Sequence, residues 1–372
     1  MGQARATRQP CPRPTVRISH FLALVCTAAL ASCSKPVPPP PAPASAPKTF
    51  KVPAIGAYNG GYLDFGDHED DVTLEGIESF EQETGRRLAI IASSSYWGEQ
   101  RFPRRNMDII SRHGSIPLVY WSPWDRPYQQ DHPPDQFSLQ SILDGKWDAY
   151  IDQWADAAKA FGHPMLVAWG IEMNGTWFPW SGFRNGADQP LGNGLFAGPE
   201  TYKKAYRYVV DRVRARGAKN ILWVFHVNNQ NAPPDPWNSM AAYYPGDDYV
   251  DWLGLSAYGA QFPGDPWFTV ESTFRQGYDE LAAISPTKPI MLAEWGIGEF
   301  PAIGPKDQWI VDAVQYMKTR MPRLKAAVVW NERWENADGS YSNLRVTSSP
   351  KSLEAFRKVS ADPFWIDHAI YK

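Results

Sequence analysis

Two glutamates stand at the ends of short apolar runs and could act together on one substrate. Glu172 closes the run MLVAWGIE, and Glu294 comes near the end of PIMLAEW. Two carboxyl groups about 5 to 5.5 Å apart can cleave a glycosidic bond, because one donates a proton to the leaving oxygen while the other attacks the anomeric carbon. A single acid at such a place can equally be a salt-bridged scaffold group. The prediction therefore depends on the two glutamates meeting in the fold.

Other catalytic chemistries have little support in the sequence. Phosphate-loop and dinucleotide glycine patterns, paired cysteine ligands and a His-Glu-x-x-His segment are absent. Ser94 and Ser95 lack the Gly-x-Ser-x-Gly elbow of a serine hydrolase, and we interpret them as structural. The seven histidines are scattered. We expect neither a metal site nor a cofactor.

The elements that must position the glutamates form a repeating pattern. From about residue 50 onward, short apolar runs alternate with segments of helical spacing, as βα units do. Tyr150, Trp154 and Phe161 show the helical spacing, and Gly162 follows them. Eight such units predict a fold of the α/β class, the (β/α)8 TIM barrel. The expected strands are residues 53–58, 88–96, 116–121, 165–172, 221–228, 250–258, 289–295 and 326–331.

In such a barrel the active site lies at the C-terminal ends of the strands. Polar residues that end a predicted strand are therefore candidates, whereas acids inside helices are not. The fourth and seventh strands lie on different sides of the ring, so the side chains at their ends can face each other. The criterion retains Glu172, Asn228, Tyr258 and Glu294, with Asn331 and Glu332 after them.

The segments around the two glutamates resemble those of a known family. WGIEMNGTWFPWSG at 169–182 is similar to the acid/base region of glycoside hydrolase family 26, and MLAEWG at 291–296 resembles the nucleophile segment of that family. The likeness extends from ILDGKWDAYIDQWA at 142–155 to VVWNERW at 328–334. It covers most of residues 50–365.

The resemblance implies a retaining endo-β-glycanase that hydrolyses a β-linked polysaccharide of β-mannan or β-glucan type by double displacement. It implies Glu172 as the acid/base, Glu294 as the nucleophile, Tyr258 as the hydroxyl beside the nucleophile and Trp330 as a platform for a sugar ring. Apolar neighbours would raise the pKa of the acid, and a tyrosine donor would keep the nucleophile ionised.

The chain departs from the family pattern beside the acid/base. The family usually has a histidine immediately before this glutamate and an arginine three residues before that histidine, where this chain has Ile171 and Ala168. The change weakens the transfer of β-mannanase activity, and other members act on mixed-linkage β-glucan or β-1,3-xylan. His226 on the fifth predicted strand is either a replacement ring or a packed strand residue.

Aromatic side chains near the predicted top face could stack on sugar rings, although about half of them would belong to a second core layer. They are Trp97, Trp121, Trp124, Trp177, Trp180 and Trp330. With these rings in view, we predict a set of residues that bind the polysaccharide. The set is Trp177, Tyr258, Trp330, Asn228, His226 and Trp121.

The N-terminus has the features of a bacterial lipoprotein. Four arginines precede an apolar run that is too short for a stable membrane span, which predicts a signal peptide over residues 1–32. LASC matches a lipobox, so Cys33 would carry lipid, and a proline-rich linker over 33–49 would lead to the catalytic domain at 50–372. Cleavage removes four arginines and no acid, which changes the net charge from −3 to −7. We therefore expect no nucleic-acid partner.

Together these features predict a monomeric enzyme of the bacterial cell envelope, anchored to the membrane through its N-terminal lipid and facing the periplasm or the exterior. Two alternatives stay open. One is a lipoprotein that binds an exopolysaccharide without cleaving it, and the other is a transglycosylase, which would use the same covalent intermediate with a sugar acceptor. Retention of both glutamates in their motifs argues against the binding protein.

Overall fold

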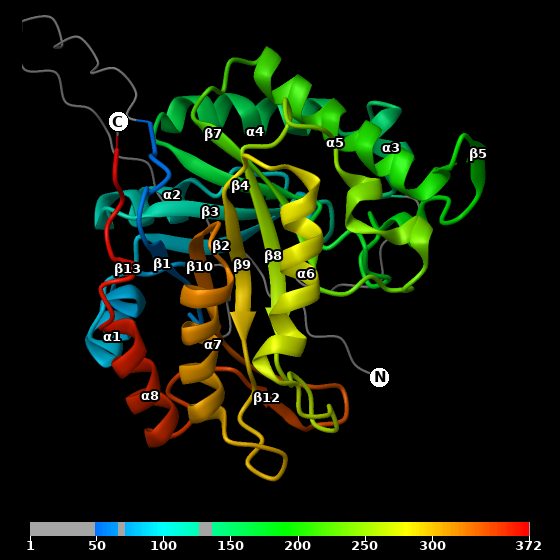
Figure 1. Cartoon of the computed structure of the whole chain (residues 1–372). Coiled ribbons are helices and arrows are strands. Elements are labelled where there is room, and N and C mark those ends of the chain that lie inside the picture. The colour runs from blue at the N-terminus through cyan, green and yellow to red at the C-terminus, as the bar shows by residue number, and fades with distance from the viewer. Residues whose placement is uncertain (1–48, 66–70, 126–135, 372) are drawn as a thin grey trace, which may run out of the picture. The chain divides into compact units, whose positions relative to one another are not determined.

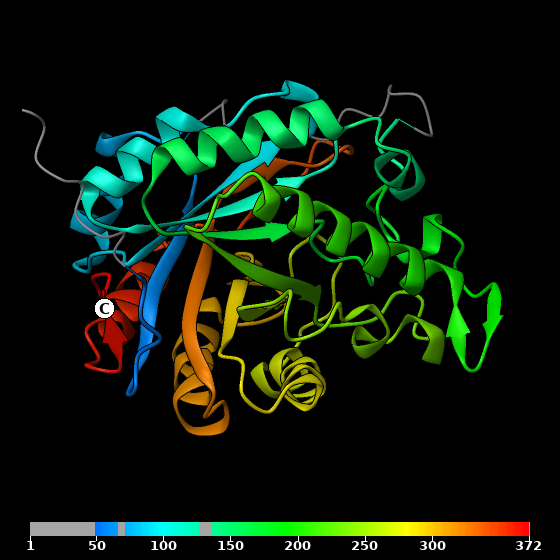
Figure 2. The same ribbon diagram turned by 90° about the horizontal axis from the view of Figure 1, so that it is seen from above.

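Eight parallel strands close into a barrel, and helices cover its outside (Figures 1 and 2). The computed structural model describes residues 49–65, 71–125 and 136–371. The strands pair in the order β10-β9-β8-β7-β4-β3-β2-β1, and β1 pairs with β10 to close the ring. The predicted (β/α)8 barrel is confirmed. The barrel strands are β1 (Ala57–Leu63), β2 (Ile90–Tyr96), β3 (Ile116–Ser122), β4 (Met165–Trp169), β7 (Ile221–Asn228), β8 (Trp252–Tyr258), β9 (Ile290–Gly296) and β10 (Leu324–Asn331).

The helices bury one face against the barrel. The helix predicted around Trp154 is α4, which ends at Phe161, and Gly162 caps it in the left-handed conformation with its N–H bonded to the carbonyl of Ala158. The other helices are α1 (Leu74–Thr84), α2 (Arg104–His113), α3 (Leu139–Leu143), α5 (Ala197–Ala215), α6 (Val270–Ile284), α7 (Lys306–Arg320) and α8 (Pro350–Ser360), and α4 itself covers Asp148–Phe161.

Short strands outside the barrel ring complete the fold. β5 (Pro190–Gly192) and β6 (Leu195–Phe196) form a hairpin before α5, and Figure 2 shows it projecting away from the barrel. β11 (Arg333–Glu335) and β12 (Tyr341–Asn343) form a second hairpin after β10. β13 (Trp365–Ile366) pairs with the first residues of β1. Among the described residues, no helix is long and apolar enough to cross a membrane.

The first strand begins later than predicted. The apolar run predicts a strand at 53–58, whereas β1 covers Ala57–Leu63 and includes two glycines. A Cβ atom at Gly60 would lie 3.0 Å from the side chain of Val328 and 3.2 Å from Ile90. Glycine is therefore required here by the close approach of neighbouring strands, not by a turn.

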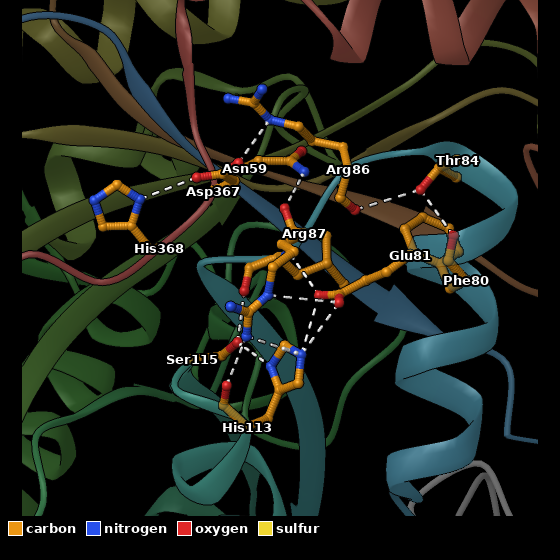
Figure 3. A network of polar contacts seen from close by, with 11 residues as sticks. Asn59, Phe80, Glu81, Thr84, Arg86, Arg87, His113, Ser115, Asp367 and His368 are labelled. Atoms are coloured by element: carbon orange, nitrogen blue, oxygen red, sulfur yellow. Dashed lines mark hydrogen bonds and ion pairs between the residues drawn. The ribbon is translucent and has the colours of Figure 1, made fainter.

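A polar network ties helices to strands at the N-terminal end of the barrel (Figure 3). The Glu81 carboxylate accepts a hydrogen bond of 2.8 Å from the backbone N–H of Leu88, and its side chain lies 3.2 Å from Nε2 of His113. Arg87 donates to the carbonyl of His113 at 2.8 Å. Because active sites of such barrels lie at the opposite end, we assign this network to stability.

The predicted signal peptide, the lipid-bearing Cys33 and nearly all of the linker lie outside the described residues. The expected start of the catalytic domain at residue 50 falls within them. Phe50 is buried and stacks on Tyr58 of β1 at a centroid distance of 4.7 Å.

Candidate active site

A cavity of about 1040 Å³ opens at the C-terminal ends of the barrel strands. Four of the six residues predicted to bind substrate line it, together with the two glutamates. These residues are Glu172, Glu294, Trp177, Asn228, Tyr258 and Trp330. The cavity therefore unites side chains from β7, β8, β9, β10 and the loop after β4.

Glu294 points into the cavity from β9. Its side chain is buried, with 6% of the residue exposed. Tyr258 lies at the end of the neighbouring strand β8, and its hydroxyl donates a hydrogen bond of 2.7 Å to Oε2 of Glu294. Burial and the two glutamates hold the pKa of Tyr258 well above 10, so this hydroxyl stays protonated and acts as a donor.

Glu172 reaches the same cavity from a turn. The predicted strand 165–172 is too long, because β4 ends at Trp169 and the chain then turns. Glu172 has a φ angle of 53°, in the left-handed region that side chains other than glycine rarely adopt. Its backbone N–H donates to the carbonyl of His226 at 2.8 Å, and its own carbonyl accepts from Gly175 at 2.9 Å. Both bonds fix the unusual conformation.

Both carboxyl groups have raised pKa values because burial disfavours their charged forms. The negative charge of Glu172 raises the pKa of Glu294 further, whereas the hydroxyls of Tyr258 and Ser256 lower it. For Glu172, the hydroxyl of Ser256 and the indole of Trp177 oppose the effect of burial on the pKa. Since the two acids interact, the pair loses its two protons in separate steps, and between these steps it holds one negative charge and one proton. That is the protonation state that a proton donor beside a nucleophile requires.

Aromatic side chains form much of the cavity wall. Trp330 is half-buried and stacks on Tyr62, with ring centroids 3.9 Å apart and an angle of 3° between the planes. Trp177 is 40% exposed, so a large part of its ring is free to contact a ligand. Phe178 and Trp180 stack on each other at 4.4 Å. Flat apolar surfaces of this kind suit the faces of sugar rings.

Trp121 is not in the cavity, which corrects the prediction that it contacts substrate. It is fully buried, stacks on Trp154 of α4 at 4.0 Å and donates from its indole nitrogen to the Tyr150 hydroxyl at 2.9 Å. Side chains alternate along a strand, and on β3 it is Tyr120 and Ser122 that line the cavity. Trp97 is likewise buried in this outer layer.

His226 lies beneath the cavity and does not line it, so the prediction that it contacts substrate is also corrected. The residue is 1% exposed, and its Nε2 lies 2.6 Å from the hydroxyl of Ser256 and 4.0 Å from Oε1 of Glu294. Ile171, in the place of the family histidine, lines the cavity with its apolar side chain.

Part of the cavity wall was not predicted from the sequence. The hairpin of β11 and β12 contributes Trp334, Glu335 and Asn336, and the loop after β8 contributes Phe262 and Asp265. The stretch from 336 to 340, NADGS, carries turn residues that could have indicated the hairpin. Among the described residues, no group of three or more His, Cys, Asp or Glu side chains could hold a metal ion.

Comparison with known proteins identifies the family. The sequence model of glycosyl hydrolase family 26 matches residues 109–336, which is more than half of the chain. The chain belongs to glycosyl hydrolase family 26. The matched segment of this family-26 domain contains both glutamates and ends in the β11–β12 hairpin.

Curated relatives carry three different activities in their names. Endoglucanase H of Acetivibrio thermocellus is 32% identical over 287 residues, which are 76% of this chain and 28% of that protein. Beta-1,3-xylanase TXYA of Vibrio sp is 25% identical over 62% of this chain and 51% of its own length. A mannan endo-1,4-beta-mannosidase of Bacillus subtilis is 26% identical over 65% of this chain and 59% of its own length. The chain thus spans between about a quarter and three fifths of these relatives.

Solved structures agree on the fold. A modular endo-beta-1,4-mannanase from Cellulomonas fimi superposes with a TM-score of 0.61 at 19% identity, over 84% of this chain and 72% of that one. The protein GH26A of Muricauda sp. MAR_2010_75 superposes with a TM-score of 0.55 at 20% identity, over 84% of this chain and 91% of that one. At these identities the likeness establishes the barrel fold alone.

Proposed function

We propose that this family-26 domain is a retaining endo-β-glycanase. The observation that carries the proposal is the meeting of Glu172 and Glu294 in one cavity, with a Tyr258 donor on Glu294. In the first step the Glu294 carboxylate bonds to the anomeric carbon, the glycosidic bond breaks and Glu172 gives its proton to the leaving oxygen. In the second step water attacks the same carbon, its proton passes to Glu172 and the bond to Glu294 breaks.

The substrate we propose is a β-linked polysaccharide of β-mannan or β-glucan type. The activities named for two of the relatives, a beta-1,3-xylanase and a mannan endo-1,4-beta-mannosidase, support a β-linked backbone. The size of the cavity and its aromatic wall support a chain of several sugars over a single one. Ile171 lines the cavity where a polar histidine would otherwise contact the sugar or the acid/base, which favours a substrate other than mannan.

Purified protein incubated with mixed-linkage β-glucan, β-mannan, β-1,3-xylan and bacterial exopolysaccharides tests the proposal. We expect oligosaccharide products from one of them, with the β-anomer formed first in proton NMR spectra. Glu294→Ala should release no product. Binding without any cleavage would favour the non-catalytic alternative, longer products would indicate transglycosylation, and an α-anomer formed first would contradict the assigned nucleophile.

We also propose that Cys33 anchors the enzyme by lipid to a bacterial envelope membrane, with the domain facing the periplasm or the exterior. The charged and apolar segments before it and the proline-rich linker after it support this proposal. Stable anchoring needs more than one acyl chain. Cys33→Ser should therefore move the protein out of the detergent phase in membrane fractionation, with Cys26→Ser as the matched control, and an unchanged membrane fraction would contradict the lipid site.

A further inference from the structure

Asn174 lies two residues after Glu172, in the turn that follows β4, and it is fully buried. Its amide nitrogen donates a hydrogen bond of 2.9 Å to the carbonyl of Asn228, and its amide oxygen accepts one of 2.9 Å from the backbone N–H of the same residue. The nitrogen also donates to Oδ1 of Asn231 at 2.9 Å. One side chain therefore ties the turn that carries Glu172 to the end of β7 and the loop after it.

The ladder between β4 and β7 ends before this turn. Its last pair is Val167 with Trp223. On its other side, Asn228 pairs with Ser256 of β8. The Asn174 amide thus gives Asn228 the acceptor and the donor that a further residue of β4 would otherwise provide. Since buried backbone groups need hydrogen-bond partners, this side chain continues the barrel wall where the strand has stopped.

The backbone of Asn174 is fixed as well. Its carbonyl accepts a hydrogen bond of 2.8 Å from the N–H of Ala232 and another of 2.8 Å from the side-chain amide of Asn238, which is itself fully buried. A left-handed residue such as Glu172 keeps its conformation only where its surroundings hold it. The contacts of Asn174 supply such a hold two residues along the chain.

The nucleophile is held in a different way. Glu294 belongs to β9, which is hydrogen-bonded to β8 on one side and to β10 on the other. Its Cα pairs directly with Ser256 of β8. The barrel itself therefore sets the place of Glu294, whereas Glu172 depends on the contacts of a turn beyond the ladder. Loss of the Asn174 amide should displace the acid/base and leave the nucleophile where it is.

We propose that Asn174 is a positioning residue for the acid/base, which holds the Glu172 carboxyl at the leaving oxygen in the first step and at the attacking water in the second. Because Asn174 is fully buried, it acts through Glu172 and not on the sugar. It breaks no bond and transfers no proton. The inference rests on the proposed double displacement.

Aryl β-glycosides of the oligosaccharide that the wild type releases test this role, because a dinitrophenyl leaving group needs no proton from Glu172 and a phenyl leaving group does. For Asn174→Ala, kcat/KM should stay close to the wild-type value with the dinitrophenyl glycoside. With the phenyl glycoside it should fall by about 100-fold, the cost of a misplacement of roughly 1 Å. Deglycosylation should slow with both, because water needs the base.

Asn59→Ala is the matched control. Asn59 is also a buried asparagine, and its amide donates to the carbonyl of Arg87 at 2.9 Å in the network at the other end of the barrel (Figure 3). This variant should keep the wild-type dependence on the leaving group, even if it is less stable. An equal loss with both leaving groups for Asn174→Ala, or wild-type rates with both, would overturn the proposal.

Two further measurements cover the remaining cases. Asn231→Ala serves if Asn174→Ala fails to fold, because Asn231 is half-buried and its loss removes one acceptor of the Asn174 amide, so the same dependence should appear at smaller size. Hydrogen exchange needs no turnover: amides of residues 171–175 and 228–232 should exchange faster in Asn174→Ala, and those of 290–296 should not. Unchanged exchange would contradict this inference, whereas an absence of glycan cleavage by the wild type would contradict only the proposed function.

Discussion

The indole nitrogen of Trp177 donates a hydrogen bond of 2.8 Å to Oε2 of Glu172. The two residues are five positions apart in the chain, so one turn supplies both the acid and a donor to its ionised form. The donor lowers the pKa of Glu172 against the larger opposite effect of burial. The pKa of Glu172 therefore depends on its own loop as well as on the barrel strands that bury it.

Trp177→Phe removes the indole N–H and keeps an aromatic ring. The pKa of Glu172 should rise, because the charged form loses a donor, and the basic limb of kcat/KM should move to higher pH by up to about one unit. Trp334→Phe is the matched control, since that indole lines the same cavity and donates to Asn336 instead. A basic limb that moves equally in both variants, or in neither, would contradict the role of Trp177.

Azide distinguishes the roles of the two glutamates. Glu172→Ala should still form the glycosyl-enzyme from an activated aryl glycoside, and added azide should restore turnover and give a β-glycosyl azide, because azide needs no base. Glu294→Ala should give only the α-azide, by direct attack from the vacated side. Exchange of the two products between the variants would mean that acid and nucleophile are reversed.

The charge of the cavity should select against acidic sugars. Five carboxyl side chains line it, and no lysine or arginine does among the described residues. We expect a β-glucan oxidised at C6 to bind about tenfold more weakly than its neutral parent at low ionic strength, with the difference shrinking as salt screens the repulsion. In titration calorimetry, Glu335→Gln should reduce the difference in affinity between the oxidised and the neutral polymer. Glu354→Gln, on the surface of α8, should leave this difference unchanged. Equal affinities for both polymers would exclude this selection.

Lys306 should make the stability of the barrel depend on pH. Its buried ammonium donates to the carbonyls of Asn343 and Arg345 and to Ser348, and burial lowers its pKa from 10.5 to about 7. Between these values the unfolded chain binds more protons than the native state, so the lysine's contribution to stability rises with pH. In urea unfolding, the free energy of unfolding of the wild type should rise relative to that of Lys306→Met from pH 7 to 10. The surface variant Lys318→Met should show no such growth, and parallel curves for Lys306→Met would contradict the low pKa.

Strand positions followed from the sequence where apolar runs were unbroken. The run 116–121 became Ile116–Ser122, and 289–295 became Ile290–Gly296. The bounds of β1 were harder to predict because it contains two glycines. In a sequence, a glycine required by close strand packing cannot be distinguished from a glycine in a turn.

The phase of a strand could not be predicted in the same way. A strand that is apolar on both faces gives no sign of which residues face the cavity, so the sequence does not distinguish Trp121 from Tyr120, which lines the cavity. Nor could the contact of His226 with Ser256 be foreseen, since it depends on the register between two strands. The two glutamates were found because their motifs are local.

The left-handed backbone at Glu172 means that the residue required for activity is not the residue that would give the most stable fold. Glycine or asparagine would suit this conformation better, and relief of such strain is worth about 1 kcal/mol. A mutation that destroys the acid would thus be favoured by folding. In a descendant of this chain that no longer needed cleavage, replacement of Glu172 by glycine or asparagine would therefore increase the stability of the fold.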